Sequence, residues 1–160
     1  MNSTFDWNEW FFILSSLVCL LIFVMLPKRF NSLVTFSLWI FVIVFIETID
    51  YFMAVKPYDL YDFLDGPGYQ PTLAVAHIAI FPPCAYFLIY FYDKWKLHGF
   101  KLALYILGWT IISITYEWIC VLNNVLTYKN WTLLFSIPTY PVACLIVITV
   151  FHFIKRNINQ

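Results

Sequence analysis

Residues 33–55 read LVTFSLWIFVIVFIETIDYFMAV and contain only two charged side chains, Glu47 and Asp50. An α-helix needs roughly 20 mostly apolar residues to cross the hydrocarbon core of a bilayer. This stretch is long enough. Its apolar run is continuous rather than alternating in polarity, which favours a helix over a strand of a membrane barrel. The stretch therefore predicts a membrane-spanning helix.

Four further apolar runs have the same character, and they cover residues 10–26, 71–92, 102–122 and 131–154. Over the whole chain 62% of the residues are hydrophobic and 11% are charged, whereas soluble domains carry about 25% charged residues. We therefore predict one membrane domain over residues 1–160. Its fold class would be all-α, a polytopic transmembrane helical bundle with about five spanning helices.

The lysines and arginines predict the direction in which these runs cross. The loops after the first and third runs, together with the C-terminal tail, hold seven of the nine: Lys28, Arg29, Lys94, Lys96, Lys101, Lys155 and Arg156. The opposite side holds only Lys56 and Lys129. Because basic loops stay in the cytoplasm, we expect the N-terminus outside and the C-terminus in the cytoplasm.

Composition also bears on partners. The formal net charge is zero, which argues against a nucleic-acid partner, since that would require a basic surface. The four cysteines lie inside apolar runs without zinc-site spacing, so we expect buried free thiols. No motif in the sequence indicates a cofactor, and none indicates a metal. The lipid bilayer is the partner that the composition requires.

The longest segment expected outside the membrane is 56–70. Pro57 suits the start of a helix and Gly66 the position just after its end. Asp59, Asp62 and Asp65 recur at a spacing of three between them. We therefore predict a short helix on the outer surface with its acids toward water. A calcium loop would need a different spacing of its carboxylates.

Four ionisable residues fall inside the predicted spans: Glu47, Asp50, His77 and Glu117. Such residues are costly in a membrane and indicate a functional site by default. With the predicted directions, the second, third and fourth spans each place one of them in the outer third of the bilayer. Three spans would then place acids and an imidazole at about the same depth in the bilayer.

Neighbouring positions support a shared polar face. Tyr51 follows Glu47 by four residues, and Thr139 follows Ser136 by three in the fifth span. The fourth span carries a polar or small stripe facing other helices, Thr110, Ser113, Glu117, Cys120 and Asn124. Pro82-Pro83, Pro138 and Pro141 interrupt the helical hydrogen-bond ladder nearby. The first span lacks comparable residues, so we expect it to be peripheral.

We therefore predict an outward-opening ligand pocket centred on Glu47, His77 and Glu117. Its expected lining is Glu47, Asp50, Tyr51, His77, Ser113, Glu117, Trp118 and Ser136. The alternative is structural, with Glu117 bonding to His77 to hold two helices together. In a catalytic reading Glu47, Asp50, Glu117 and His77 would be the acid and base candidates.

The C-terminal half also resembles a known family. The segments Phe81-Pro-Pro83, Tyr90–Lys94, Tyr116-Glu-Trp118 and Lys129-Asn-Trp131 are similar to those of small, uncharacterised multi-pass membrane proteins of spore-forming Firmicutes. The resemblance covers about the last 80 residues. It implies a bacterial plasma membrane and draws attention to Glu117, Trp118 and Trp131. By architecture alone, the bundle is also similar to sterol-isomerase-like membrane enzymes.

Three functions follow from this pattern. The leading one is binding or sensing a small or amphipathic ligand, or supporting a membrane protein partner. The second is an intramembrane enzyme with isomerase-like or hydratase-like acid–base chemistry on a lipid or isoprenoid. The third is a transporter subunit or assembly factor, although the chain lacks the internal repeat from which many transporters are built.

Overall fold

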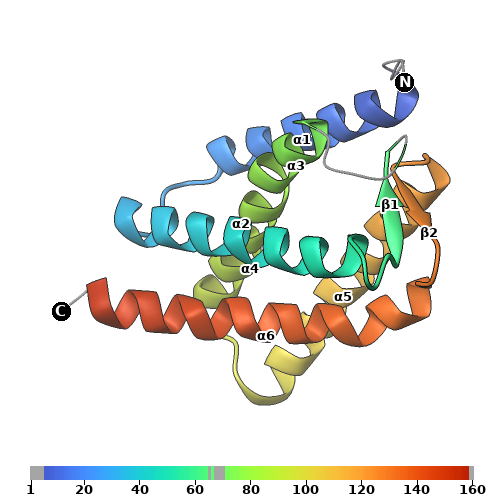
Figure 1. The fold of residues 1–160 in the computed structure, drawn as a ribbon. Helices are drawn as coiled ribbons and strands as arrows, with labels where there is room; N and C mark the ends of the chain where they lie inside the picture. Colours follow the sequence, from blue (N-terminus) through green and yellow to red (C-terminus); the bar gives the residue numbers. More distant parts are fainter. Residues whose placement is uncertain (1–5, 65, 67–70, 159–160) are drawn as a thin grey trace.

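A computed structural model describes residues 6–64, 66 and 71–158, and most of them are helical (Figure 1). The helices are α1 (Trp7–Met25), α2 (Ser32–Ala54), α3 (Pro71–Ala79), α4 (Phe81–Trp95), α5 (Gly99–Leu122) and α6 (Leu133–Ile158). Two short strands, β1 (Tyr61–Phe63) and β2 (Leu126–Tyr128), join loops far apart in the sequence. The predicted all-α class is confirmed, with this small ribbon added to it.

Helices α1, α2, α5 and α6 are each long and apolar enough to cross a membrane. Large apolar side chains on all four point outward, and Leu17, Phe36, Leu107 and Leu145 are each roughly half exposed or more. Apolar surface this extensive is foreign to a soluble monomer, so lipid is the solvent that accommodates it. The chain is a multi-pass, membrane-embedded helical protein.

The third predicted run forms two helices instead of one. α3 ends at Ala79, and α4 begins at Phe81 with Pro82 and Pro83 in its first turn. Proline is tolerated there because the first turn of a helix has no internal partner for its N–H groups. The predicted interruption at Pro82-Pro83 is thus confirmed. In contrast, α6 continues through Pro138 and Pro141 without ending.

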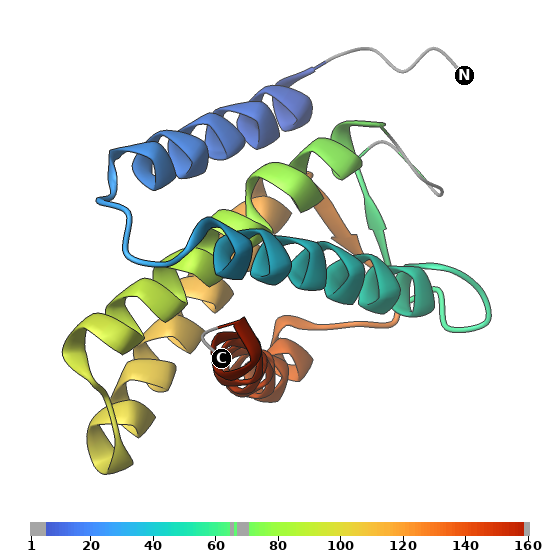
Figure 2. The same cartoon turned by 90° about the vertical axis from the view of Figure 1, so that its left-hand side faces the viewer.

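The helices pack around α2 and α6. α2 contacts α4 and α6, α5 contacts α6, and α1 lies against α3 and α4 (Figures 1 and 2). The main core joins Val42 of α2, Ile89 of α4, Ile106 of α5 and Phe151 of α6. Among the described residues, α1 supplies no buried side chain to this core. Its Phe12 belongs to a second core with Tyr61 and Cys120, so α1 is less peripheral than expected.

The predicted outer helix between Pro57 and Gly66 is wrong, because this segment forms β1. Asp59 and Leu64 have φ angles of 45° and 53°, which a right-handed helix does not allow. Between them, aromatic and acidic residues alternate as a strand requires. β1 pairs antiparallel with β2, and Tyr61 lies opposite Tyr128.

The acids of this segment also differ from the prediction. Asp59 and Asp62 do not simply face water, because the Lys129 Nζ lies 2.8 Å from a carboxylate oxygen of each. These bonds raise the pKa of Lys129 above its ordinary value. Asp65 lies outside the described residues.

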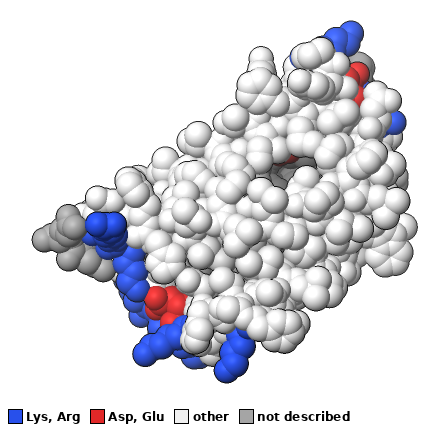
Figure 3. Space-filling view, turned by 90° about the horizontal axis from the view of Figure 1, so that it is seen from below, with Lys and Arg blue, Asp and Glu red and all other residues white. Residues whose placement is uncertain are grey.

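The charged residues gather at the ends of the bundle (Figure 3). Seen from the side of α6, a broad uncharged face separates a cluster of Lys and Arg from the opposite end. We call the end with Lys28, Arg29, Lys94, Lys96, Lys101, Lys155 and Arg156 the basic end, and the end with β1 and β2 the ribbon end. The uncharged face between them fits the hydrocarbon of a bilayer.

Candidate functional site

His77 of α3 lies between two acids of α2 and is only 1% exposed. Its Nδ1 atom is 2.8 Å from Glu47 Oε1, and its Nε2 atom is 2.9 Å from Asp50 Oδ2. The second contact departs from the direction of a straight hydrogen bond, so we describe it as a bent ion pair. Glu47 and Asp50 are one helical turn apart, which lets a single imidazole reach both. We call these three residues the His77 triad.

The tautomer of the imidazole decides the hydrogen bonding in the His77 triad. With a hydrogen on Nδ1, His77 donates to Glu47 Oε1. Nε2 then lies near Asp50 Oδ2 without a well-directed hydrogen bond. A protonated imidazole would carry a hydrogen on each ring nitrogen and would present a donor to both carboxyl groups. The His77 triad is therefore two carboxyl groups placed around one buried imidazole.

The triad differs in exposure from one member to the next. The side chain of Glu47 is 39% exposed, that of Asp50 17% and that of His77 1%. The rings of Phe63 and Phe81 lie 6.4 and 5.5 Å from the imidazole, between centroids. Glu47 thus presents carboxylate surface at the edge of an otherwise apolar enclosure.

The apolar face in Figure 3 is hollowed in its half remote from the basic cluster, and acidic atoms are visible inside the hollow. Negative charge at the floor of an opening in a lipid-facing surface is the arrangement that a polar or cationic ligand group would need. Among the described residues, no group of three His, Cys, Asp or Glu side chains is arranged to hold a metal ion.

Glu117 of α5 lies in a second cluster, where three hydroxyl groups donate to one carboxylate. Tyr128 and Ser136 donate to Oε1 at 2.6 and 2.7 Å, and Tyr140 donates to Oε2 at 2.6 Å. The Trp131 indole N–H donates in turn to the Ser136 hydroxyl at 2.9 Å. Because Glu117 is only 9% exposed, these bonds replace the water that the carboxylate has lost. We call this the Glu117 cluster.

The ribbon joins the two clusters. Tyr61 donates to Asp50 Oδ1 at 2.8 Å, and its cross-strand partner Tyr128 donates to Glu117. Side chains directly opposite in an antiparallel pair project from the same face, so both hydroxyls reach into the bundle. Burial, followed by the neighbouring carboxylates, raises the pKa of Tyr61 and of Tyr128 well above the ordinary value for tyrosine. Both phenols therefore remain hydrogen-bond donors at neutral pH.

The structure divides the predicted pocket into these two clusters. It brings Glu47, Asp50 and His77 together, and it places Glu117 with Ser136 instead of with His77. The alternative in which Glu117 bonds to His77 is therefore wrong. The ribbon, not direct contact, connects the two acidic sites.

Two residues of the predicted lining lie elsewhere, because Tyr51 and Trp118 are turned outward, 66% and 52% exposed. Ser113 is half-buried, one turn before Glu117 on α5. Trp118 follows Glu117 directly, so a helix rotates it about 100° away from the inward face. Tyr51 lies on the far side of Glu47 from Asp50 around α2. His77 occupies the space between the two acids, and Tyr51 falls outside it.

The sequence reasoning missed three tyrosines of the site, Tyr61, Tyr128 and Tyr140. Tyr61 and Tyr128 belong to the short strands β1 and β2, which lie between the long helices, and only the strand pairing brings them to the carboxylates. Tyr140 does carry a signal, because it follows Ser136 by four residues and therefore shares its helix face.

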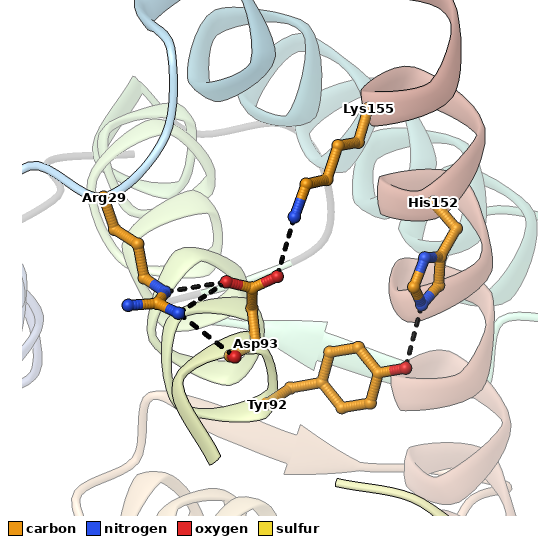
Figure 4. A network of polar contacts seen from close by, with 5 residues as sticks. All are labelled: Arg29, Tyr92, Asp93, His152 and Lys155. Atoms are coloured by element: carbon orange, nitrogen blue, oxygen red, sulfur yellow. Dashed lines mark hydrogen bonds and ion pairs between the residues drawn. The ribbon is translucent and has the colours of Figure 1, made fainter. Parts of the chain in front are cut away.

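At the basic end, Asp93 connects three segments (Figure 4). Its carboxylate accepts from Arg29 of the α1–α2 loop and from Lys155 of α6, each at 2.8 Å. Tyr92 and His152 form a further contact of 2.8 Å between α4 and α6. Asp93 thus fixes the loop and both helices at this end.

We expect Asp93→Asn to lower the free energy of unfolding by about 1–2 kcal/mol. Both ion pairs lose their anion, and the effect is modest because the charged groups are partly exposed to water. Burial alone would raise the pKa of Asp93, but Lys155 and Arg29 outweigh it and lower that pKa. The stabilisation is therefore present at neutral pH and is lost on acidification through the lowered pKa. Thermal melting in detergent at pH 7 and at low pH measures both effects. Lys96→Gln is the control, and equal losses in the two variants would contradict this role.

No family model, no curated protein and no solved structure matches this chain.

Proposed function

We propose that this protein binds an amphipathic ligand with a cationic or hydrogen-donating head group, and that the His77 triad receives the head group. The observation that carries the proposal is that Glu47, the outermost carboxyl group of the His77 triad, is 39% exposed beside a buried imidazole. A charge at this depth is costly in a membrane and requires a compensating partner. A ligand cation would supply it.

The surroundings support an amphipathic rather than a fully polar ligand. The rings of Phe63 and Phe81 flank the imidazole, and apolar side chains dominate the outer surface. A ligand entering from the lipid would leave its tail among apolar groups and place only its head group at Glu47. The Glu117 cluster, whose carboxylate already accepts three hydroxyl donors, would hold the framework of the site.

The proposal is tested by comparing dodecylamine with dodecanol, which has the same tail and no charge. In neutral detergent micelles, isothermal titration should show dodecylamine binding about tenfold or more tightly, as expected for one charge-assisted bond. Glu47→Gln should remove this preference. Asp59→Asn is the matched control, because it removes an acid at the same end that is already paired with Lys129. An unchanged preference in Glu47→Gln would refute the proposal.

A second candidate is an intramembrane enzyme acting by acid–base chemistry on a lipid or isoprenoid. It is favoured by the contact of one imidazole with two carboxyl groups, which are the residue types that general acid–base catalysis uses. In that case Glu47, as the exposed member, would exchange a proton with the substrate. Glu47→Gln would then abolish turnover while leaving the binding of a neutral substrate analogue nearly unchanged.

We further propose five crossings with the N-terminus outside, in a bacterial plasma membrane. The α3–α4 pair would form the fifth crossing, over residues 71–92, in addition to the four long helices. The concentration of basic residues at one end supports this direction. The membrane type follows from the resemblance to the Firmicutes family.

This orientation predicts the outcome of cysteine labelling on intact cells. In a background where the four native cysteines are replaced by serine or alanine, a membrane-impermeant maleimide should label Asp62→Cys and should leave Lys96→Cys unlabelled. Lysed cells should show labelling of both. Labelling of Lys96→Cys alone on intact cells would reverse the proposed topology.

A further inference from the structure

A shallow groove of about 550 Å³ runs between α2 and α6 in the half of the molecule toward the basic end. Phe36, Ile40 and Phe41 line it on α2, and Val150, Phe153 and Ile154 line it on α6. It lies well away from the His77 triad, since Glu47 is six or more residues beyond these α2 positions. The groove opens on the lipid-facing surface, and its lining fits an acyl chain.

The groove runs toward the positively charged end of the molecule. The basic end carries seven basic residues and one acid, Asp93, for a net charge of +6. Asp93 is already engaged by Arg29 and Lys155. Arg156 follows Phe153 by three residues, so it lies on the same face of α6 one turn beyond the groove, and its side chain is exposed.

We propose that this groove binds one acidic phospholipid from the leaflet that the basic end faces. An acyl chain lies between α2 and α6, and the phosphate group meets the Arg156 guanidinium. A guanidinium can donate two parallel hydrogen bonds to a phosphate, and the surrounding positive charge attracts anionic head groups. The charge complementarity at the mouth favours an acidic lipid over a zwitterionic one.

Native mass spectrometry of the full chain, released from detergent with equal amounts of phosphatidylglycerol and phosphatidylcholine, tests the proposal. The expected result is one retained phosphatidylglycerol, with a dissociation constant about tenfold below that of phosphatidylcholine. Arg156→Gln should lose most of this selectivity. Ser37→Trp, which fills the groove from α2, should reduce retention of both lipids. Its circular dichroism checks the fold.

Lys101→Gln is the matched control, since it removes the same charge from the same end but lies on α5. Equal losses of selectivity in Arg156→Gln and Lys101→Gln would show only the general charge of this end and would overturn the site. Competition by inorganic phosphate as effective as that by the whole lipid would also overturn it, because the acyl groove would then contribute nothing.

Discussion

Replacing Glu117 with alanine is expected to lower the free energy of unfolding by about 3–5 kcal/mol. The reason is not the loss of one residue's contacts alone. The hydroxyls of Tyr128, Ser136 and Tyr140 would all lose their acceptor inside the protein. A buried donor left unsatisfied costs about 1–3 kcal/mol, and the two half-buried tyrosines add less than Ser136 because water can partly replace their acceptor. Reversible unfolding in mixed detergent and SDS micelles measures the change.

Glu117→Gln separates hydrogen bonding from charge. The amide oxygen can still accept from Tyr128 and Ser136, while Tyr140 must rotate its hydroxyl to accept from the amide N–H₂. We therefore expect a loss of only about 1 kcal/mol. Trp118→Leu is the control, because the Trp118 side chain follows Glu117 in the sequence but is 52% exposed and lies outside the Glu117 cluster. If Glu117→Ala and Glu117→Gln lower the free energy of unfolding by the same amount, the three hydroxyl bonds do not hold the Glu117 cluster together.

The second large effect is expected for His77→Leu. Leucine fills much of the imidazole volume but leaves Glu47 and Asp50 facing each other without a shared donor. Removing one partner of a fully buried charge pair costs about 3–5 kcal/mol, and because Glu47 is 39% exposed we expect a smaller loss of about 2–3 kcal/mol here. The same unfolding measurement should show a loss of that size.

A double mutant tests whether this loss is electrostatic. Adding Asp50→Asn to His77→Leu removes one of the two opposed carboxylates, so we expect the double mutant to be more stable than His77→Leu alone. Asp59→Asn, an acid-to-amide change away from the His77 triad at a residue that is 36% exposed, serves as the control. Strict additivity of His77→Leu and Asp50→Asn would mean that cavity formation, not the charge arrangement, explains the loss.

The membrane helices were predictable because lipid imposes one demand on the chain, a long apolar run. Residues 33–55 and 102–122 satisfy it, and α2 and α5 lie within a few residues of those bounds. The break at Pro82-Pro83 was also predictable, since proline lacks the N–H group that a continuous helix needs. These features depend only on local sequence.

The ribbon depends on a pairing between loops more than sixty residues apart, and short strands carry little local signal. Tyr61 lies among acids that suggested a solvated helix, yet it pairs with Tyr128 and reaches Asp50. Their similar predicted depth in the bilayer was the only reason to expect that Glu47, His77 and Glu117 share one site. Which partners each acid has depends on helix rotation, and a spacing pattern does not determine the rotation of α5 relative to α3.

In the proposed function Glu47 is an accessible carboxyl group that binds a ligand from the lipid, whereas Glu117 is enclosed. Dicyclohexylcarbodiimide, a lipid-soluble reagent that modifies carboxyl groups, tests both parts when labelled peptides are quantified by mass spectrometry. The account predicts labelling of Glu47, little labelling of Glu117, and protection of Glu47 by dodecylamine but not by dodecanol. Equal labelling of Glu47 and Glu117, or labelling of Glu47 that dodecylamine leaves unchanged, would contradict it.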